Sequence, residues 1–151
     1  MNRFVSSVLL ICSSMTAHSN EACNVAYENI ERVDAEKECV LKAKNGNAEA
    51  QFGYGLMLIS GHGRESDPKK AYQWFLSSAK QGHKLSQTMM GRMLSDTRFG
   101  VPLNMPEAYA WWSISNNESS ASKLWARLSP KQQKKAKELT NVYTAEYSLG
   151  K

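Results

Sequence analysis

The chain has 151 residues, of which 42% are hydrophobic and 22% are charged, and it carries a formal net charge of +5. This length suits one domain, and this composition is typical of a soluble globular protein rather than of a disordered or fibrous chain. The positive charge does not indicate a nucleic-acid-binding protein, because the basic residues are interspersed with glutamates and no basic run is interleaved with stacking aromatics.

The first 19 residues have the pattern of an export signal. A short positive start precedes a mostly apolar segment at residues 4–11, and residues 17–19 form a small-x-small cleavage site. The apolar segment is too short to span a membrane permanently. A lipoprotein would be acylated at Cys12, although Ile11 stands where a small residue is wanted. We therefore expect a signal peptide at residues 1–19, cleavage near Ser19, and a periplasmic or secreted mature protein.

Removal of the signal peptide leaves two cysteines, Cys23 and Cys39. An even number of cysteines in an exported chain predicts a disulfide bond. A bond between these two would close a short loop and stabilise the fold by about 3 kcal/mol. The alternative is two unrelated buried thiols.

Residues 20–46 read as an N-terminal capping pair of helices. Two repeats follow at residues 47–82 and 83–117, because residues 43–58 register with residues 79–94 at a spacing of 36. Such a period indicates a stack of helical units, none of which can bury its apolar face alone. In each repeat we expect a helix A and a helix B, with helix B starting after an N-cap at Asp67 or Asn104.

Two glycines fall in the middle of the predicted A helices, at positions 55 and 91. A mid-helix glycine costs about 1 kcal/mol relative to alanine, so we expect close approach of the partner helix, with Ala71 and Ala108 opposite. The aromatic residues of the B helices should fill the space between successive pairs; these are Trp74, Phe75, Trp111 and Trp112.

Residues 118–151 are predicted to form C-terminal capping helices. Residues 116–120 are a polar break, and a capping box at Ser129 and Gln132 starts the last helix. One side of that helix carries Ala136 and Tyr143, and its other side is rich in lysine. A charged outer face of this kind is what a terminal unit needs for solubility.

These motifs resemble the Sel-one-like repeat family, a relative of the tetratricopeptide repeats. The resemblance rests on residues 43–51, Gly55, Asp67 and the Ala71–Gly82 pattern, and it extends over residues 35–115. It implies an all-α superhelix (solenoid) of about four antiparallel helix pairs, in which the A helices line a concave groove. Family members usually act as scaffolds or adaptors of other proteins. Some exported bacterial members of this size are immunity proteins against secreted toxins.

No enzyme motif stands out in the sequence. His62 and His83 lack a second ligand at metal-binding spacing, and we expect no catalytic residue, no metal and no cofactor. We predict a protein or peptide partner, with a secreted toxin as one candidate, and no nucleic acid or membrane span. The groove residues should be those of the A helices that the packing pattern leaves over: Gln51, Phe52, Leu56, Gln87, Thr88, Met89 and Arg92. The loop residues Arg98 and Phe99 form a second candidate patch.

Two alternatives to this reading remain open. The terminal helices could cover the apolar groove residues. Some cysteine-rich secreted relatives have been linked to binding or hydrolysis of β-lactams, so the alternative function is a secreted repeat protein that binds or hydrolyses β-lactams or peptidoglycan.

Overall fold

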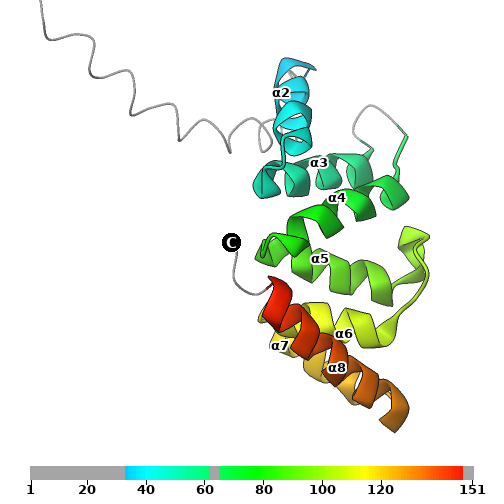
Figure 1. Ribbon diagram of the computed structural model, residues 1–151. Coiled ribbons are helices and arrows are strands. Elements are labelled where there is room, and N and C mark those ends of the chain that lie inside the picture. Colours follow the sequence, from blue (N-terminus) through cyan, green and yellow to red (C-terminus); the bar gives the residue numbers. More distant parts are fainter. Residues whose placement is uncertain (1–32, 62–64, 148–151) are drawn as a thin grey trace, which may run out of the picture.

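The computed structural model describes residues 33–61 and 65–147, which form seven α-helices and one short 3-10 helix and contain no strand. The helices follow one another down a stack, so the predicted all-α solenoid is confirmed (Figure 1). Their bounds are α2 (Val33–Lys44), α3 (Ala48–Ser60), α4 (Pro68–Lys80), α5 (Lys84–Ser95), η1 (Thr97–Phe99), α6 (Met105–Ile114), α7 (Glu118–Trp125) and α8 (Pro130–Tyr147). The predicted signal peptide, Cys23 and the first helix of the capping pair lie outside the described residues.

From α2 to α7, each α-helix packs against the next one along the chain. The last helix departs from this order, because α8 packs mainly across α6 and also reaches α4, rather than pairing with α7. The C-terminal helices predicted at residues 118–151 are α7 and α8, and both pack on α6. The helix α7 has only eight residues, whereas α8 has 18, so α7 is too short to cover its neighbour. The aromatic side chains of α8 find their contacts on α6 instead.

The turns that lead from a B helix into the next A helix share one geometry. A residue with positive φ occurs at Gly46 (89°), Gly82 (85°) and Asn116 (65°). In each turn the following side chain caps the next helix by accepting a backbone N–H from three residues ahead; these caps are Asn47, His83 and Asn117. The polar break at residues 116–120 is thus a third copy of this turn, since asparagine tolerates the left-handed region almost as glycine does.

The turns that lead from an A helix into its B helix also repeat. The backbone N–H of Asp67 donates to the carbonyl of Leu58 across 2.9 Å, and that of Asn104 donates to Leu94 across 2.9 Å. The side chains of Asp67 and Asn104 accept from the N–H groups of Lys70 and Glu107. Both predicted N-caps are confirmed, as is the capping box at the start of α8.

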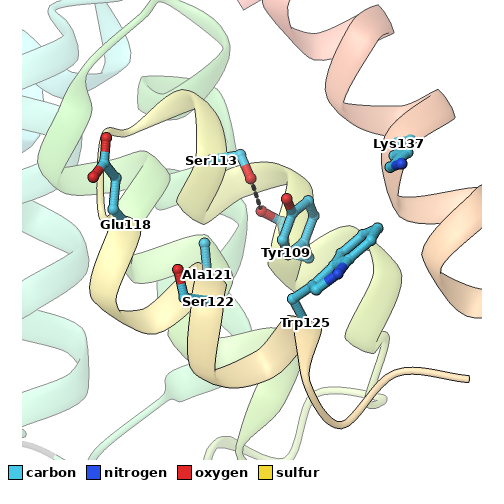
Figure 2. A pocket seen from close by; sticks show the side chains of 7 residues that line it. All are labelled: Tyr109, Ser113, Glu118, Ala121, Ser122, Trp125 and Lys137. Carbon is cyan, nitrogen blue, oxygen red and sulfur yellow. Dashed lines mark hydrogen bonds between the residues drawn. The ribbon is translucent and has the colours of Figure 1, made fainter.

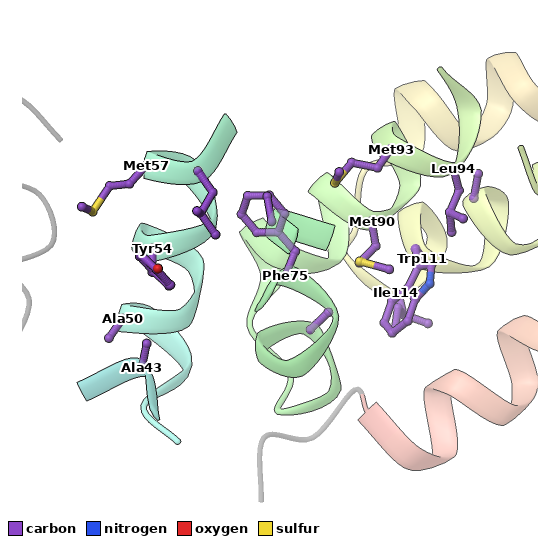
Figure 3. Packing of buried hydrophobic residues seen from close by; sticks show 14 of the residues in the cluster. Ala43, Ala50, Tyr54, Met57, Phe75, Met90, Met93, Leu94, Trp111 and Ile114 are labelled. Atoms are coloured by element: carbon purple, nitrogen blue, oxygen red, sulfur yellow. The ribbon is translucent and has the colours of Figure 1, made fainter. Parts of the chain in front are cut away.

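The mid-helix glycines let aromatic rings approach the A helices closely. A Cβ atom on Gly55 would lie 2.6 Å from Cε1 of Phe75, and one on Gly91 would lie 2.6 Å from Cδ1 of Trp112. Close approach was predicted correctly, but the nearest atoms belong to these rings rather than to the expected alanines. Figure 3 shows the resulting core, which continues from α3 past Phe75 to α5 and α6.

Candidate functional site

Two of the residues predicted to line the groove, Gln51 and Gln87, are buried. The exposed fraction is 6% for Gln51 and 0% for Gln87, so neither can face a partner. Each side-chain amide donates across 3.1 Å to a carbonyl at the end of the preceding B helix, that of Ala43 for Gln51 and that of Ala79 for Gln87. Both glutamines therefore fasten successive units together, because a helix end leaves carbonyls without an intrahelical partner.

The remaining predicted residues of the A helices do reach the surface. Phe52, Leu56, Thr88 and Met89 are half-buried, and Arg92 is exposed. Position 52 corresponds to position 88, and 56 to 92, at the repeat spacing of 36, so they lie on equivalent faces of α3 and α5. The sequence interpretation missed Leu85, which is 57% exposed. Leu85 lies one helical turn before Thr88 and Met89, and that spacing was the available signal. We call these six residues the A-helix face.

The half-buried members of the A-helix face also contact the core. The Phe52 ring lies 5.7 Å from the Phe75 ring and 5.0 Å from the His83 ring, measured between centroids. Leu56 and Met89 also pack against buried residues. Of the described helices, α8 packs mainly on α6 and also on α4, and it reaches α5 through the hydrogen bond from Gln87 to the Tyr147 carbonyl, so its main contacts lie on the B helices.

The second predicted patch adjoins the A-helix face. The Arg92 guanidinium lies 5.9 Å from the centroid of the Phe99 ring, at the end of α5. Arg98 pairs with Asp96 at 2.6 Å, and its hydrogen bonds lower the pKa of that carboxyl to about 2. The structure therefore joins Arg92 and Phe99 in one patch, while Arg98 is engaged by its neighbour.

A chain of hydrogen bonds crosses the boundary between the two repeats. Nε2 of His83 lies 2.8 Å from the Glu49 carboxylate, and its Nδ1 lies 2.9 Å from Oγ of Ser86. The Ser86 hydroxyl donates to Ser78, which donates to the carbonyl of Ala48. The order Glu–His–Ser resembles that of a hydrolytic triad, but Ser86 is fully buried and a nucleophile must reach its substrate. This arrangement ties α3, α4 and α5 together.

A second polar cluster attaches α8 to α6. The Glu107 carboxylate accepts hydrogen bonds from the Tyr143 hydroxyl (3.0 Å) and from the Trp111 indole (3.3 Å). Burial, and then the negative charge of Glu107, raise the pKa of Tyr143 above its ordinary value. The phenol therefore stays protonated and remains a hydrogen-bond donor.

Within the described residues, no group of three His, Cys, Asp or Glu side chains could hold a metal ion. None of the helices there is long and apolar enough to cross a membrane.

A pocket that the sequence did not predict lies between α6, α7 and α8 (Figure 2). Its volume is about 530 Å³, which falls within the range of small-ligand pockets. Residues from all three helices line it, and these helices come together only when the chain folds. The lining residues are Tyr109, Ser113, Glu118, Ala121, Ser122, Trp125 and Lys137. This pocket, referred to below as the C-terminal pocket, is separate from the A-helix face.

Comparison with known proteins agrees with this fold. The model of the Sel1 repeat matches residues 48–83 and 84–118. Among solved structures, the chain is similar to c5321, described as a protective antigen present in uropathogenic Escherichia coli strains displaying an SLR fold. The two share 24% sequence identity with a TM-score of 0.79, over 88% of this chain and 30% of that one. The chain therefore spans less than a third of that protein's length. No curated protein matches the chain.

Proposed function

Because the chain carries two Sel1 repeats and belongs with the Sel1-like repeat proteins, we propose that it is an exported protein-binding module. Such repeats are helical modules that typically mediate protein–protein interaction. In this proposal the A-helix face holds a protein or peptide partner, and the protein acts as a periplasmic adaptor, inhibitor or immunity protein. A secreted toxin is the candidate partner.

The exposed apolar side chain of Leu85 is the observation that carries this proposal. It is 57% exposed and lies beside the partly exposed Met89, so it belongs to an apolar group on one helix face rather than being a single exposed leucine. The partly buried Met89 and Thr88 lie one turn further along α5, and the charged Arg92 follows. An apolar residue beside a cation fits a partner that presents an apolar side chain next to a carboxylate.

The export half of the proposal rests on the sequence of residues 1–19 and on the cysteine pair. Cys39 is fully buried on α2, where a bond to Cys23 would tie residues before the stack to its first described helix. Mass spectrometry of protein recovered from the periplasm should show cleavage near Ser19 and a mass lower by two hydrogens than that of the reduced chain. An uncleaved cytoplasmic protein with three alkylatable thiols, those of Cys12, Cys23 and Cys39, would refute export and the bond.

The partner-binding half is tested by a matched pair of surface variants. Leu85→Lys places a charge on the A-helix face, whereas Val142→Lys makes the same kind of change on α8, where Val142 is 48% exposed. Both variants should unfold at the wild-type temperature, because both side chains are exposed. Tagged mature protein should recover a stoichiometric partner from periplasmic extract, and Leu85→Lys should lose it while Val142→Lys keeps it. Equal recovery by both variants would refute the A-helix face as the binding surface.

A further inference from the structure

We propose that the C-terminal pocket is a second binding site, and that it takes a short peptide with a free ammonium group, a free carboxylate and an apolar side chain. This inference concerns a surface other than the A-helix face. It does not depend on the function proposed for that face.

The floor of the pocket is aromatic. The rings of Tyr109 on α6 and Trp125 on α7 lie 4.9 Å apart between centroids and are tilted by 44°. Both residues are half-buried, so part of each ring remains open to the pocket, and the buried Ala121 lies beside them. A tilted pair of rings next to a small aliphatic residue is suited to an apolar side chain.

Opposite charges stand on the two sides of this floor. Figure 2 shows the Glu118 carboxylate at the start of α7 and Lys137 on α8, with the two rings between them. Both side chains are exposed. Neither forms an ion pair with any residue whose side chain the structure describes (36–61 and 65–147). The Lys137 ammonium lies 5.3 Å from the centroid of the Trp125 ring. The ring therefore places this cation directly beside the apolar floor.

A zwitterion matches this distribution of charge. Its ammonium group would pair with Glu118, its carboxylate with Lys137, and its side chain would cover the rings. The Ser113 hydroxyl donates to the carbonyl of Tyr109, so its own oxygen is free to accept a further hydrogen bond. A neutral sugar could stack on the same rings but would use neither charge, so the charge pair favours the zwitterion.

The proposal is tested with the dipeptide Phe-Ala and its capped forms. In NMR spectra of the mature protein, free Phe-Ala at millimolar concentration should shift the indole N–H signal that Trp125→Phe removes. N-acetylated and C-amidated forms should each bind about threefold more weakly, as expected for the loss of one exposed ion pair. Equal binding of free and capped forms, binding of cellobiose alone, or no shift at all would overturn the proposal.

Double-mutant comparisons assign each charge to its partner. In Glu118→Gln, N-acetylation should no longer weaken binding, while C-amidation still does; Lys137→Gln should show the reverse. Lys134→Gln, an exposed lysine on the same helix that does not line the pocket, should behave as the wild type. A variant of either charge that keeps the wild-type response to both caps would contradict the assignment. Leu85→Lys should leave dipeptide binding unchanged, so the two proposals can fail separately.

Discussion

The two repeats have the same packing positions, but the side chains at these positions are buried to different depths. Trp74 and Trp111 occupy the same place one repeat apart, yet Trp111 is 1% exposed and Trp74 is half-buried. Trp74 makes an edge contact with Tyr54 at 5.3 Å, whereas Trp111 lies beneath Tyr143 at 4.5 Å and Tyr147 at 5.7 Å. The repeat pattern therefore places an aromatic residue at this position in both repeats. Contacts with α8 determine how deeply that residue is buried in the second repeat.

A similar difference separates the two buried glutamines. Oε1 of Gln51 accepts a hydrogen bond from Nε2 of Gln81 at 2.8 Å. Oε1 of Gln87 has no donor among the described residues. The C-cap residue of α4 is Gln81, whereas the C-cap residue of α6 is Ser115, which has a shorter side chain. Gln87 instead donates to the Tyr147 carbonyl at 3.1 Å as well as to the preceding helix end. Substitutions of equivalent residues in the two repeats therefore test this comparison directly.

The largest difference is expected between Trp111→Ala and Trp74→Ala. Removal of a buried tryptophan costs about 3–5 kcal/mol, and Trp111 also loses its bond to Glu107. The half-buried Trp74 should cost about 2 kcal/mol, because less area leaves the core. Urea unfolding of both variants measures these losses. Equal losses would mean that α8 does not stabilise the second repeat.

The two glycines should differ next. Gly55→Ala would push a methyl group against Phe75, which is fully buried and cannot move aside, so we expect a loss of about 2 kcal/mol. In Gly91→Ala the neighbouring Trp112 is half-buried and can shift outward, although it must weaken its 3.2 Å bond to the Thr88 carbonyl. The gain in helix propensity offsets part of this cost, and a net loss below about 1 kcal/mol is expected. Thermal unfolding distinguishes the two variants, and a larger loss for Gly91→Ala would contradict this account.

The glutamine difference should be reversible by exchange. Gln81→Ser removes the donor to Gln51 and should cost about 1 kcal/mol, because a buried acceptor is left without a partner. Ser115→Gln should supply the donor that Gln87 lacks and stabilise by up to about 1 kcal/mol. The backbone φ is −86° at Gln81 and −82° at Ser115, so the new side chain starts from the same geometry. The midpoint of urea unfolding should fall in the first variant and rise in the second; a fall in both would refute the equivalence.

The smallest effect concerns the 3-10 turn η1 in the loop of the second repeat. Arg98→Ala should raise the pKa of Asp96 from about 2 toward its ordinary value of 3.8. A lowered carboxyl pKa stabilises the folded state above the ordinary pKa, and this contribution is lost as the pH falls toward about 2. Carboxyl chemical shifts followed from pH 6 to pH 2 measure the change. An unchanged midpoint in Arg98→Ala would show that the ion pair is absent in solution.

Much of this fold could be predicted from the sequence because the signals for its helices and turns are local. Caps such as Asp67, turn glycines such as Gly82 and the alternation of helices act over a few residues, so they can be read directly. The burial of Gln51 and Gln87 was mispredicted because glutamine is usually a surface residue. Their recurrence at the repeat spacing was the signal that they belong to the packing positions.

The two surfaces proposed to bind ligands were harder to predict from the sequence for a physical reason. Phe52, Leu56 and Met89 were recognised as apolar positions outside the packing pattern, but the exposure of Leu85 depends on how α5 is rotated against its neighbours. The C-terminal pocket requires α8 to lie across α6, and no local pattern specifies that contact. Surfaces made by three helices depend on tertiary packing, which a repeat period does not encode.

The hydrogen bond between Gln87 and Tyr147 joins residues 60 positions apart, whereas most helix contacts join neighbours in the chain. Neighbouring helices can therefore assemble early and quickly, and the docking of α8 closes the longest loop. Until the last helix arrives, the apolar face of α6 around Trp111 stays open to solvent. The end of the chain thus determines when the protein stops being prone to aggregation, and a chain truncated before Tyr143 should misassemble rather than merely lose a helix.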